Sequence, residues 1–127
     1  MSDDAARLIS EGDPAPVRVL RPSGRSEFFL TADHAGRAIP QRLGRLGLSE
    51  SELARHIAWD IGIAGVTEKL AQALDATAVL QAYSRLVIDC NRQPGWASSI
   101  PLISELTAIP GNQGIPPAER EARRREI

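Results

Sequence analysis

The chain is organised around the stretch Glu27-Phe28-Phe29-Leu30-Thr31-Ala32-Asp33-His34-Ala35-Gly36. Its first five residues are typical of a β-strand, and the apolar run Phe28–Leu30 predicts a strand covered on both faces, as in a parallel or mixed sheet. Asp33 and His34 follow where that strand ends. In α/β proteins, binding and catalytic groups collect where strands end and loops begin. The loop at His34 is therefore the first place to look for a function.

The composition is that of one ordinary domain. The chain has 127 residues, 43% of them hydrophobic and 24% charged, with a formal net charge of -1. This length can bury a core, and the balanced charge gives no field that would attract nucleic acid or an anionic membrane. A single cysteine excludes an internal disulfide framework and a multi-cysteine zinc site. We expect a cytoplasmic protein without nucleic-acid or membrane partners, and the oligomeric state stays open.

Short strands alternate with one long helical pattern. A capping box from Ser49 to Glu52 begins a helix expected over Glu50–Leu74, and Gly62 and Gly65 favour a break in its middle. The predicted strands are Val17–Leu20, Glu27–Thr31, Thr77–Gln81 and Leu86–Asp89. The pattern predicts an α/β fold in which a mixed sheet carries this helix on one face.

The two ends of the chain differ from its centre. We expect residues 1–16 to form a flexible N-terminal segment and residues 17–127 to form the domain. Proline and glycine between Gln93 and Pro117 predict a functional or mobile loop. A last helix begins at Ala118, and its alternating glutamates and arginines predict a solvated surface without an apolar face. The chain stops within that helix without a C-cap, so we expect it to be a fragment.

Two histidines could bind a metal. His34 sits beside Asp33, and a neutral imidazole is the commonest metal ligand in proteins, which an adjacent carboxylate can orient or assist. A loop histidine that bonds to backbone is the alternative. His56 and Asp60 lie four residues apart on the predicted helix and would share a face there. That spacing suits two metal ligands or an ordinary surface pair.

Polar residues also follow the last predicted strand. Asn91 and Arg92 could bind a carboxylate, because a planar guanidinium forms a bidentate pair and the amide adds a neutral donor. Arg85 either adds a second cation or pairs with Asp89. The sequence has neither a phosphate-binding glycine loop nor a Gly-x-Ser-x-Gly motif, which removes nucleotide-binding and common serine-hydrolase functions.

Three ordered motifs resemble the N-formylglutamate amidohydrolase family. They are Asp33-His34-Ala35-Gly36 with Ile39-Pro40, His56-Ile57-Ala58-Trp59-Asp60-Ile61-Gly62, and Tyr83-Ser84-Arg85-Leu86-Val87-Ile88-Asp89-Cys90-Asn91-Arg92. Residues 109–114 are similar to the long loop of that family, so the resemblance covers residues 17–127. It implies a three-layer α/β/α fold like that of zinc carboxypeptidases. The implied reaction is metal-assisted removal of a formyl or other acyl group from an acidic amino acid.

The resemblance also implies roles for individual residues. His34 matches the first ligand of a divalent metal, expected to be zinc, and Asp60 is the candidate for a second ligand. Asn91 and Arg92 match a pair that holds the substrate carboxylate, with Arg85 as a further substrate-binding cation; His34 and Arg92 would be catalytic. Family members are about twice as long and carry another histidine motif in their second half, which this sequence lacks. We therefore expect an incomplete, inactive site.

Two other functions remain open at this point. One is a non-catalytic module that binds small carboxylates through Arg92 without hydrolysing them. The other is assembly through the arginine-rich last helix.

Overall fold

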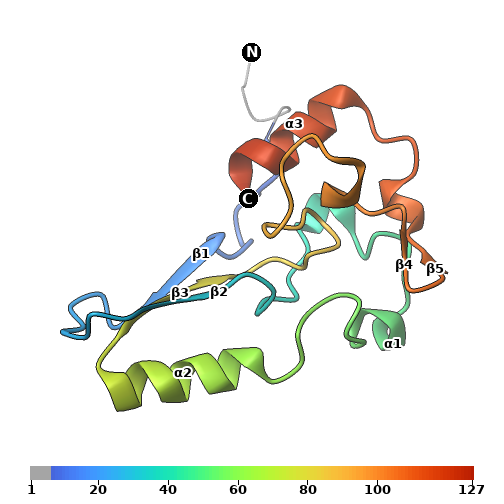
Figure 1. Cartoon of the computed structure of the whole chain (residues 1–127). Coiled ribbons are helices and arrows are strands. Elements are labelled where there is room, and N and C mark those ends of the chain that lie inside the picture. The colour runs from blue at the N-terminus through green and yellow to red at the C-terminus, as the bar shows by residue number, and fades with distance from the viewer. Residues whose placement is uncertain (1–6) are drawn as a thin grey trace.

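A computed structural model describes residues 7–127. Strands β1 (Val17–Leu20), β2 (Phe29–Ala32) and β3 (Thr77–Gln81) form a sheet in the order β1-β3-β2. Because β3 runs antiparallel to β1 and parallel to β2, the sheet is mixed. Helix α2 (Ile63–Leu74) lies along one face of this sheet and contacts β2 and β3 (Figure 1). The α/β class with a mixed sheet is confirmed.

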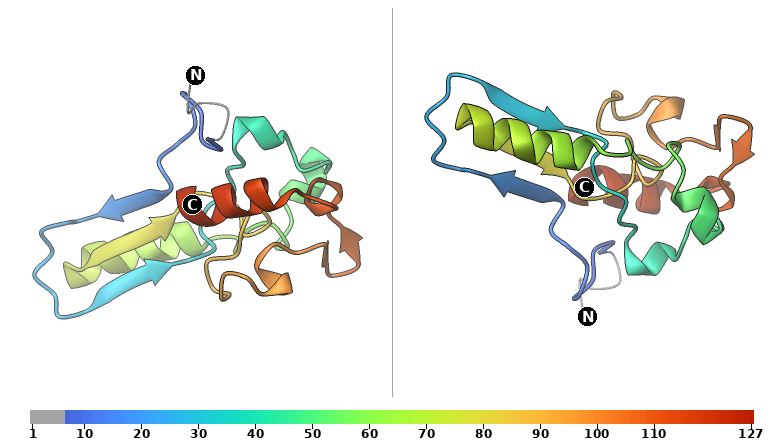
Figure 2. Two further views of the ribbon diagram at one scale, coloured as in Figure 1. Left: turned by 90° about the horizontal axis from the view of Figure 1, so that it is seen from above. Right: turned by 90° about the horizontal axis from the view of Figure 1, so that it is seen from below.

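The remaining elements are short and lie beyond the end of the sheet where β2 and β3 stop (Figure 2). In Figure 1, α3 lies on the opposite side of the sheet's plane from α2. These elements are α1 (Glu50–Leu53), α3 (Pro117–Glu126), the hairpin β4 (Ile103–Ser104) and β5 (Thr107–Ala108), and the 3-10 turns η2 (Gln41–Leu43), η3 (Ala97–Ser99) and η4 (Pro110–Asn112).

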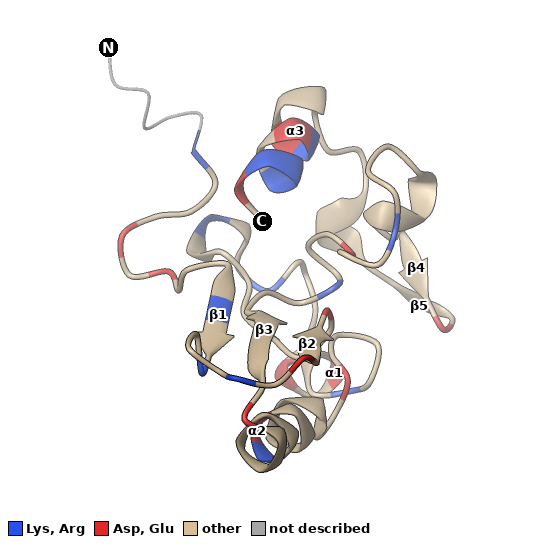
Figure 3. Ribbon diagram, turned by 60° about the vertical axis from the view of Figure 1, so that its left-hand side comes forward, with Lys and Arg blue, Asp and Glu red and all other residues tan. Residues whose placement is uncertain are grey.

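Apolar residues form two separate cores. One fills the space between the sheet and α2, and it consists of Ala32, Ala35, Ala71, Ala78 and Leu80. The other lies among the irregular segments, and it consists of Leu46, Leu48, Leu53, Ala58, Leu86, Val87 and Ile109. Basic and acidic residues are interspersed over the ribbon (Figure 3). Within residues 7–127, no helix is long and apolar enough to cross a membrane.

The sheet face opposite α2 is exposed in the described structure. The strand register places Val17, Val19 and Phe29 on this face, and they are 50%, 49% and 60% exposed. Phe28, just before β2, is 68% exposed. The prediction of a strand covered on both faces is therefore wrong for Phe28 and Phe29. A run of apolar residues indicates that both faces can be buried, but it does not supply the element that covers them.

The predicted strand Leu86–Asp89 is absent, because Leu86 and Val87 lie in a turn and Ile88 and Asp89 have no regular structure. Leu86 and Val87 are nevertheless buried at 1% and 0% exposure. A short apolar run indicates burial but does not distinguish a buried strand from other buried backbone. The bounds of β1 and β3 match the predictions, whereas β2 begins and ends later than predicted for Glu27–Thr31.

The predicted helix Glu50–Leu74 is broken in two. Its capping box is present, since the side chain of Ser49 accepts from the Glu52 amide and the Glu52 carboxylate accepts from the Ser49 amide. The first helix ends after a single turn at Leu53, and residues 54–62 are irregular. Gly62, with a φ of 85°, precedes α2. A left-handed conformation at this point is one that glycine adopts without strain.

The prediction of a flexible segment over residues 1–16 falls partly outside the described residues, which begin at residue 7. Further along, the amide of Leu8 donates to the Glu126 carboxylate at 2.8 Å. The hydroxyl of Tyr83 donates to the carbonyl of Pro14 at 2.6 Å. These bonds join the segment to α3 and to the end of β3.

The final helix is not solvated on every side. Arg123 is fully buried, and its guanidinium donates to the Val87 carbonyl at 3.0 Å and to the Asn112 side chain at 2.7 Å. The prediction of a solvated arginine face is wrong for this residue. Alternation of charges along a sequence does not reveal which cation is directed inward.

Candidate functional site

The loop that carries His34 is held against the segment that follows β3. Because β2 and β3 are parallel, their carboxyl ends lie at the same edge of the sheet. The two chain segments pair once more beyond the strands, at Ala38 and Tyr83. Between them, a Cβ on Gly36 would lie 2.0 Å from the carbonyl oxygen of Ala82. Only glycine permits this approach, which explains the glycine two residues after His34.

The imidazole of His34 contacts a buried carboxylate. Its Nε2 lies 2.6 Å from Oδ1 of Asp89, and the two side chains are 10% and 5% exposed. A carboxylate acceptor places a proton on Nε2, which leaves Nδ1 of the neutral ring free to accept or to bind a metal. Nδ1 lies 3.6 Å from Oδ2 of Asp60, whose side chain is 50% exposed. The unprotonated nitrogen of His34 therefore lies close to a second, half-exposed carboxylate.

Arg85 connects the two carboxylates. Its guanidinium lies 3.2 Å from Oδ2 of Asp89 and 3.7 Å from Oδ1 of Asp60. Burial acts to raise the pKa of the Asp89 carboxyl. Hydrogen bonds from the His34 ring and from the backbone amide of Asn91, together with the charge of Arg85, outweigh burial and hold that pKa below its ordinary value. Asp89 is thus held as an anion beside the imidazole.

Asp60 reaches this position from an irregular segment. Its backbone amide donates to the carbonyl of His34 at 2.8 Å, which ties the two loops together. His56 does not join them, because it is exposed and pairs with Glu105 at 2.8 Å. The prediction that His56 and Asp60 share a helical face is wrong, since residues 54–62 are not helical.

Asn91 and Arg92 lie at the exposed rim of this cluster. The backbone amide of Asn91 donates to Oδ1 of Asp89 at 2.9 Å, and the Arg92 guanidinium donates to the backbone carbonyl of Asn91 at 3.0 Å. Among the ion pairs of the described residues, none involves Arg92. Sequence reasoning did not assign Asp89 to the site; the available signal was its place four residues after Arg85, at the polar end of a buried run.

The donors at His34 and Asp60 fit zinc in kind. An imidazole nitrogen and a carboxylate oxygen are both common zinc ligands, and a catalytic zinc site uses three protein ligands and an open position. The described residues contain no group of three or more histidine, cysteine, aspartate or glutamate side chains placed to hold a metal. Within residues 7–127, His34 and Asp60 therefore fall short of the three protein ligands that such a zinc site uses.

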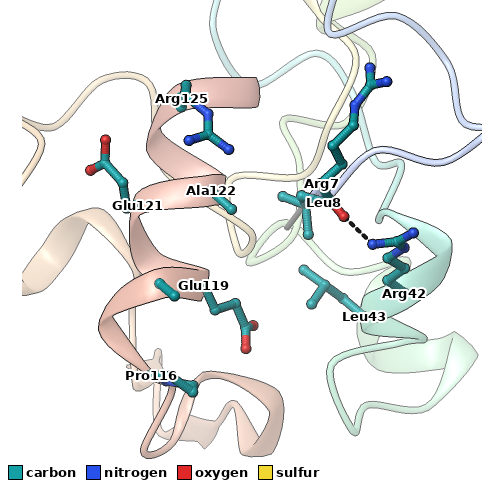
Figure 4. A pocket seen from close by; sticks show the side chains of 10 residues that line it. Arg7, Leu8, Arg42, Leu43, Pro116, Glu119, Glu121, Ala122 and Arg125 are labelled. Atoms are coloured by element: carbon teal, nitrogen blue, oxygen red, sulfur yellow. Dashed lines mark hydrogen bonds between the residues drawn. The ribbon is translucent and has the colours of Figure 1, made fainter. Parts of the chain in front are cut away.

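A separate pocket, shown in Figure 4, is lined by none of the residues of this cluster. It has a volume of about 540 Å³ and lies between α3, η2 and the first described residues. Its lining combines apolar and charged side chains: Arg7, Leu8, Arg42, Leu43, Pro116, Ala118, Glu119, Glu121, Ala122 and Arg125. None of the residues predicted to act on a substrate or a metal lines it.

Comparison with known families identifies the chain's relatives. The family model described as N-formylglutamate amidohydrolase matches residues 26–127. The chain belongs to the N-formylglutamate amidohydrolase family. This confirms the relationship that the three sequence motifs indicate.

A solved structure is similar over nearly the whole chain. The crystal structure of gene product Atu2144 from Agrobacterium tumefaciens is 40% identical, with a TM-score of 0.92. The match covers 95% of this chain and 48% of that chain, so the present chain spans about half the length of this relative. No match was found among the curated proteins.

Proposed function

We propose that this chain carries the first part of the active site of a metal-dependent amide hydrolase. The substrate would be N-formylglutamate or another N-acyl derivative of an acidic amino acid. The family supports amide hydrolysis in general, and the metal and the substrate are the proposal. The observation that carries it is the arrangement of His34, with Nε2 bonded to buried Asp89 and Nδ1 3.6 Å from the Asp60 carboxylate.

In this proposal, His34, Asp60 and Asp89 have different roles. Nδ1 of His34 and the carboxylate of Asp60 would hold the metal, for which zinc is the expected ion. A bound zinc would polarise the amide carbonyl and lower the pKa of a water molecule. Asp89 would fix the tautomer and the orientation of the His34 ring, as a carboxylate does behind a metal-binding histidine.

The rim supplies the recognition of the acidic substrate. The exposed guanidinium of Arg92, which has no ion-pair partner within residues 7–127, would bind the substrate carboxylate in a bidentate manner, and the Asn91 amide would assist. Arg85 already lies beside two carboxylates, so it would serve mainly to keep Asp60 and Asp89 in place. A cytoplasmic location stays a prediction.

The decisive experiment is a metal titration with matched variants. Zinc is titrated into metal-free protein and followed by calorimetry, with His34→Ala as the test and His56→Ala as the control. We expect His34→Ala to abolish the specific binding and His56→Ala to leave it unchanged, since His56 pairs with Glu105 on the surface. Equal binding by both variants, or no specific binding by the unaltered protein, would contradict the proposal.

The second candidate function is a non-catalytic module that binds a small carboxylate. The observation in its favour is that the described residues contain no group of three or more metal-binding side chains, whereas a catalytic zinc site uses three protein ligands. Such a module would bind N-formylglutamate equally well with and without zinc. Binding that requires the metal, or turnover of the substrate, would favour the hydrolase.

A further inference from the structure

The segment that carries Asp89 has no sheet ladder to hold it. After the end of β3, Leu86 and Val87 lie in a turn and residues 88 and 89 have no regular structure, yet this segment brings Asp89 to His34. Isolated hydrogen bonds, several of them from polar side chains, take the place of strand pairing here. The Ser84 hydroxyl donates to the Ala58 carbonyl at 2.7 Å, and the amide of Asp89 donates to the Ser99 carbonyl at 2.7 Å. The carbonyls of Leu86 and Val87 require donors of their own, since buried backbone oxygens are almost always paired.

Those donors come from distant parts of the chain. The Asn112 amide, in η4, donates to the carbonyls of Leu86 and Pro101 at 2.8 and 2.7 Å. The Arg123 guanidinium, in α3, donates to the Val87 carbonyl at 3.0 Å and to the Asn112 oxygen at 2.7 Å. The Val87 carbonyl stands midway in sequence between Arg85 and Asp89, the two charged members of the cluster on this segment.

A buried arginine at position 123 is not needed merely to pack α3 against the rest of the domain. Its side chain is fully buried, its Nε has no hydrogen-bond partner within the described residues, and its charge is balanced by Glu119, which is 29% exposed, at 2.7 Å. A buried ion pair often contributes no more stability than apolar side chains of similar volume. A guanidinium does, however, fix the direction of the groups it contacts through a rigid fork of donors. We therefore expect the Arg123 guanidinium to orient the groups that it contacts rather than only to hold α3 in place.

We propose that Arg123, together with Asn112, is a positioning residue for the pair formed by Asp89 and His34. By holding the Val87 and Leu86 carbonyls, these side chains fix the turn that presents the Asp89 carboxylate to Nε2 of His34. The importance of this for catalysis rests on the proposed function. The contact between His34 and Asp89 involves only side chains of this chain, so it can be tested separately from metal binding.

The test is nuclear magnetic resonance of the imidazole groups in metal-free protein labelled with ¹⁵N-histidine. The chain has only two histidines, and exposed His56 serves as an internal reference. In the unaltered protein we expect a slowly exchanging proton on Nε2 of His34. Arg123→Met should abolish that signal and leave the His56 signals in place. Arg120→Met, an exposed arginine on the same helix, is the control and should change neither histidine.

Arg123→Lys guards against failure of the first variant to fold. It retains the buried charge but lacks the fork of donors, so it should also lose the slowly exchanging His34 proton. A folded Arg123→Met or Arg123→Lys protein with an unchanged His34 signal would overturn the proposal. Equal changes at both histidines would overturn it too, because they would reveal a general effect on folding. If the unaltered protein and all variants fail to bind zinc while the His34 proton signal responds to the Arg123 substitutions as expected, only the proposed function is refuted.

Discussion

Nε2 of His34 lies 2.6 Å from Oδ1 of Asp89, which is 55 residues further along the chain. The same pair of chemical groups occurs a second time in the molecule, between His56 and Glu105 at 2.8 Å. The two pairs differ in burial, since the side chains of the first are 10% and 5% exposed and those of the second are 59% and 64% exposed. Exposed ion pairs contribute little because solvent screens them. Substitutions in the exposed pair of His56 and Glu105 therefore serve as controls for the same substitutions in the buried pair of His34 and Asp89.

Asp89→Asn should weaken zinc binding by about 10- to 100-fold, the range typical of losing a carboxylate behind a metal-binding histidine. The amide keeps the shape of the side chain but removes the charge that His34 and Arg85 both contact. Glu105→Gln makes the same chemical change at the exposed pair and should leave zinc affinity unaltered. Isothermal titration calorimetry measures both. A similar effect of the two substitutions would contradict the role of Asp89.

Because the pKa of Asp89 is lowered, the free energy of unfolding depends on pH in the acidic range. Since the folded-state pKa lies below the ordinary value of 3.8, the unfolded chain binds more protons at this carboxyl, and stability rises with pH there. The stabilisation is present above pH 3.8 and is lost as the pH falls through the folded-state pKa. Urea unfolding between neutral and acidic pH should show a smaller loss in Asp89→Asn than in the unaltered protein. Parallel pH profiles for the two proteins would be the contrary result.

A second pH dependence of stability is expected at alkaline pH, where Tyr83 ionises. Burial, followed by the charges of Asp13 and Glu126, raises the pKa of its phenol from 10.0 to about 12. Tyr83 is the only tyrosine, so the ultraviolet absorbance of the phenolate reports this group alone. Because the folded protein retains the proton that the unfolded chain releases, its stabilisation is complete below pH 10 and is lost as the pH rises through about 12. A titration midpoint near 10 in folded protein would contradict the burial of this hydroxyl.

The fold was predictable where local pattern decides structure. The strand bounds of β1 and β3 and the capping box at Ser49 follow from apolar runs and from a side chain that satisfies free helix amides. The structure of Leu86–Asp89 was not predictable in this way, because Asn112 and Arg123 from distant segments donate to the carbonyls of Leu86 and Val87. An apolar run reports burial, and the identity of its hydrogen-bond partners lies elsewhere in the chain.

The candidate site was predictable in part for a related reason. The position of His34 at a strand end follows from the sequence, and its distance of 3.6 Å from Asp60 is compatible with the predicted shared metal, which stays a prediction. The pairing of His56 with Asp60 assumed a helix that residues 54–62 do not form. Asp89 was identified only as a possible partner of Arg85, since contacts between residues so far apart in sequence depend on how the loops fold.

Arg92 and Arg85 should separate substrate binding from folding. Arg92 is exposed and in no ion pair within the described chain, so Arg92→Ala should change the free energy of unfolding by no more than about 0.5 kcal/mol. Arg85 is 27% exposed and contacts buried Asp89, so Arg85→Ala should cost about 1–2 kcal/mol by removing a charged hydrogen bond. Differential scanning calorimetry provides this comparison.

Substrate affinity should respond in the opposite order. Arg92→Ala removes a charge-assisted bidentate contact worth about 1.5–3 kcal/mol, which corresponds to roughly 10- to 100-fold weaker binding of N-formylglutamate by zinc-loaded protein. Arg92→Lys should recover only part of the affinity, because an ammonium is a point charge and lacks the planar fork. Calorimetric titration of the substrate measures each variant. If Arg92→Ala lowered the melting temperature as much as Arg85→Ala and left binding intact, Arg92 would be a structural residue and the substrate carboxylate would need another partner.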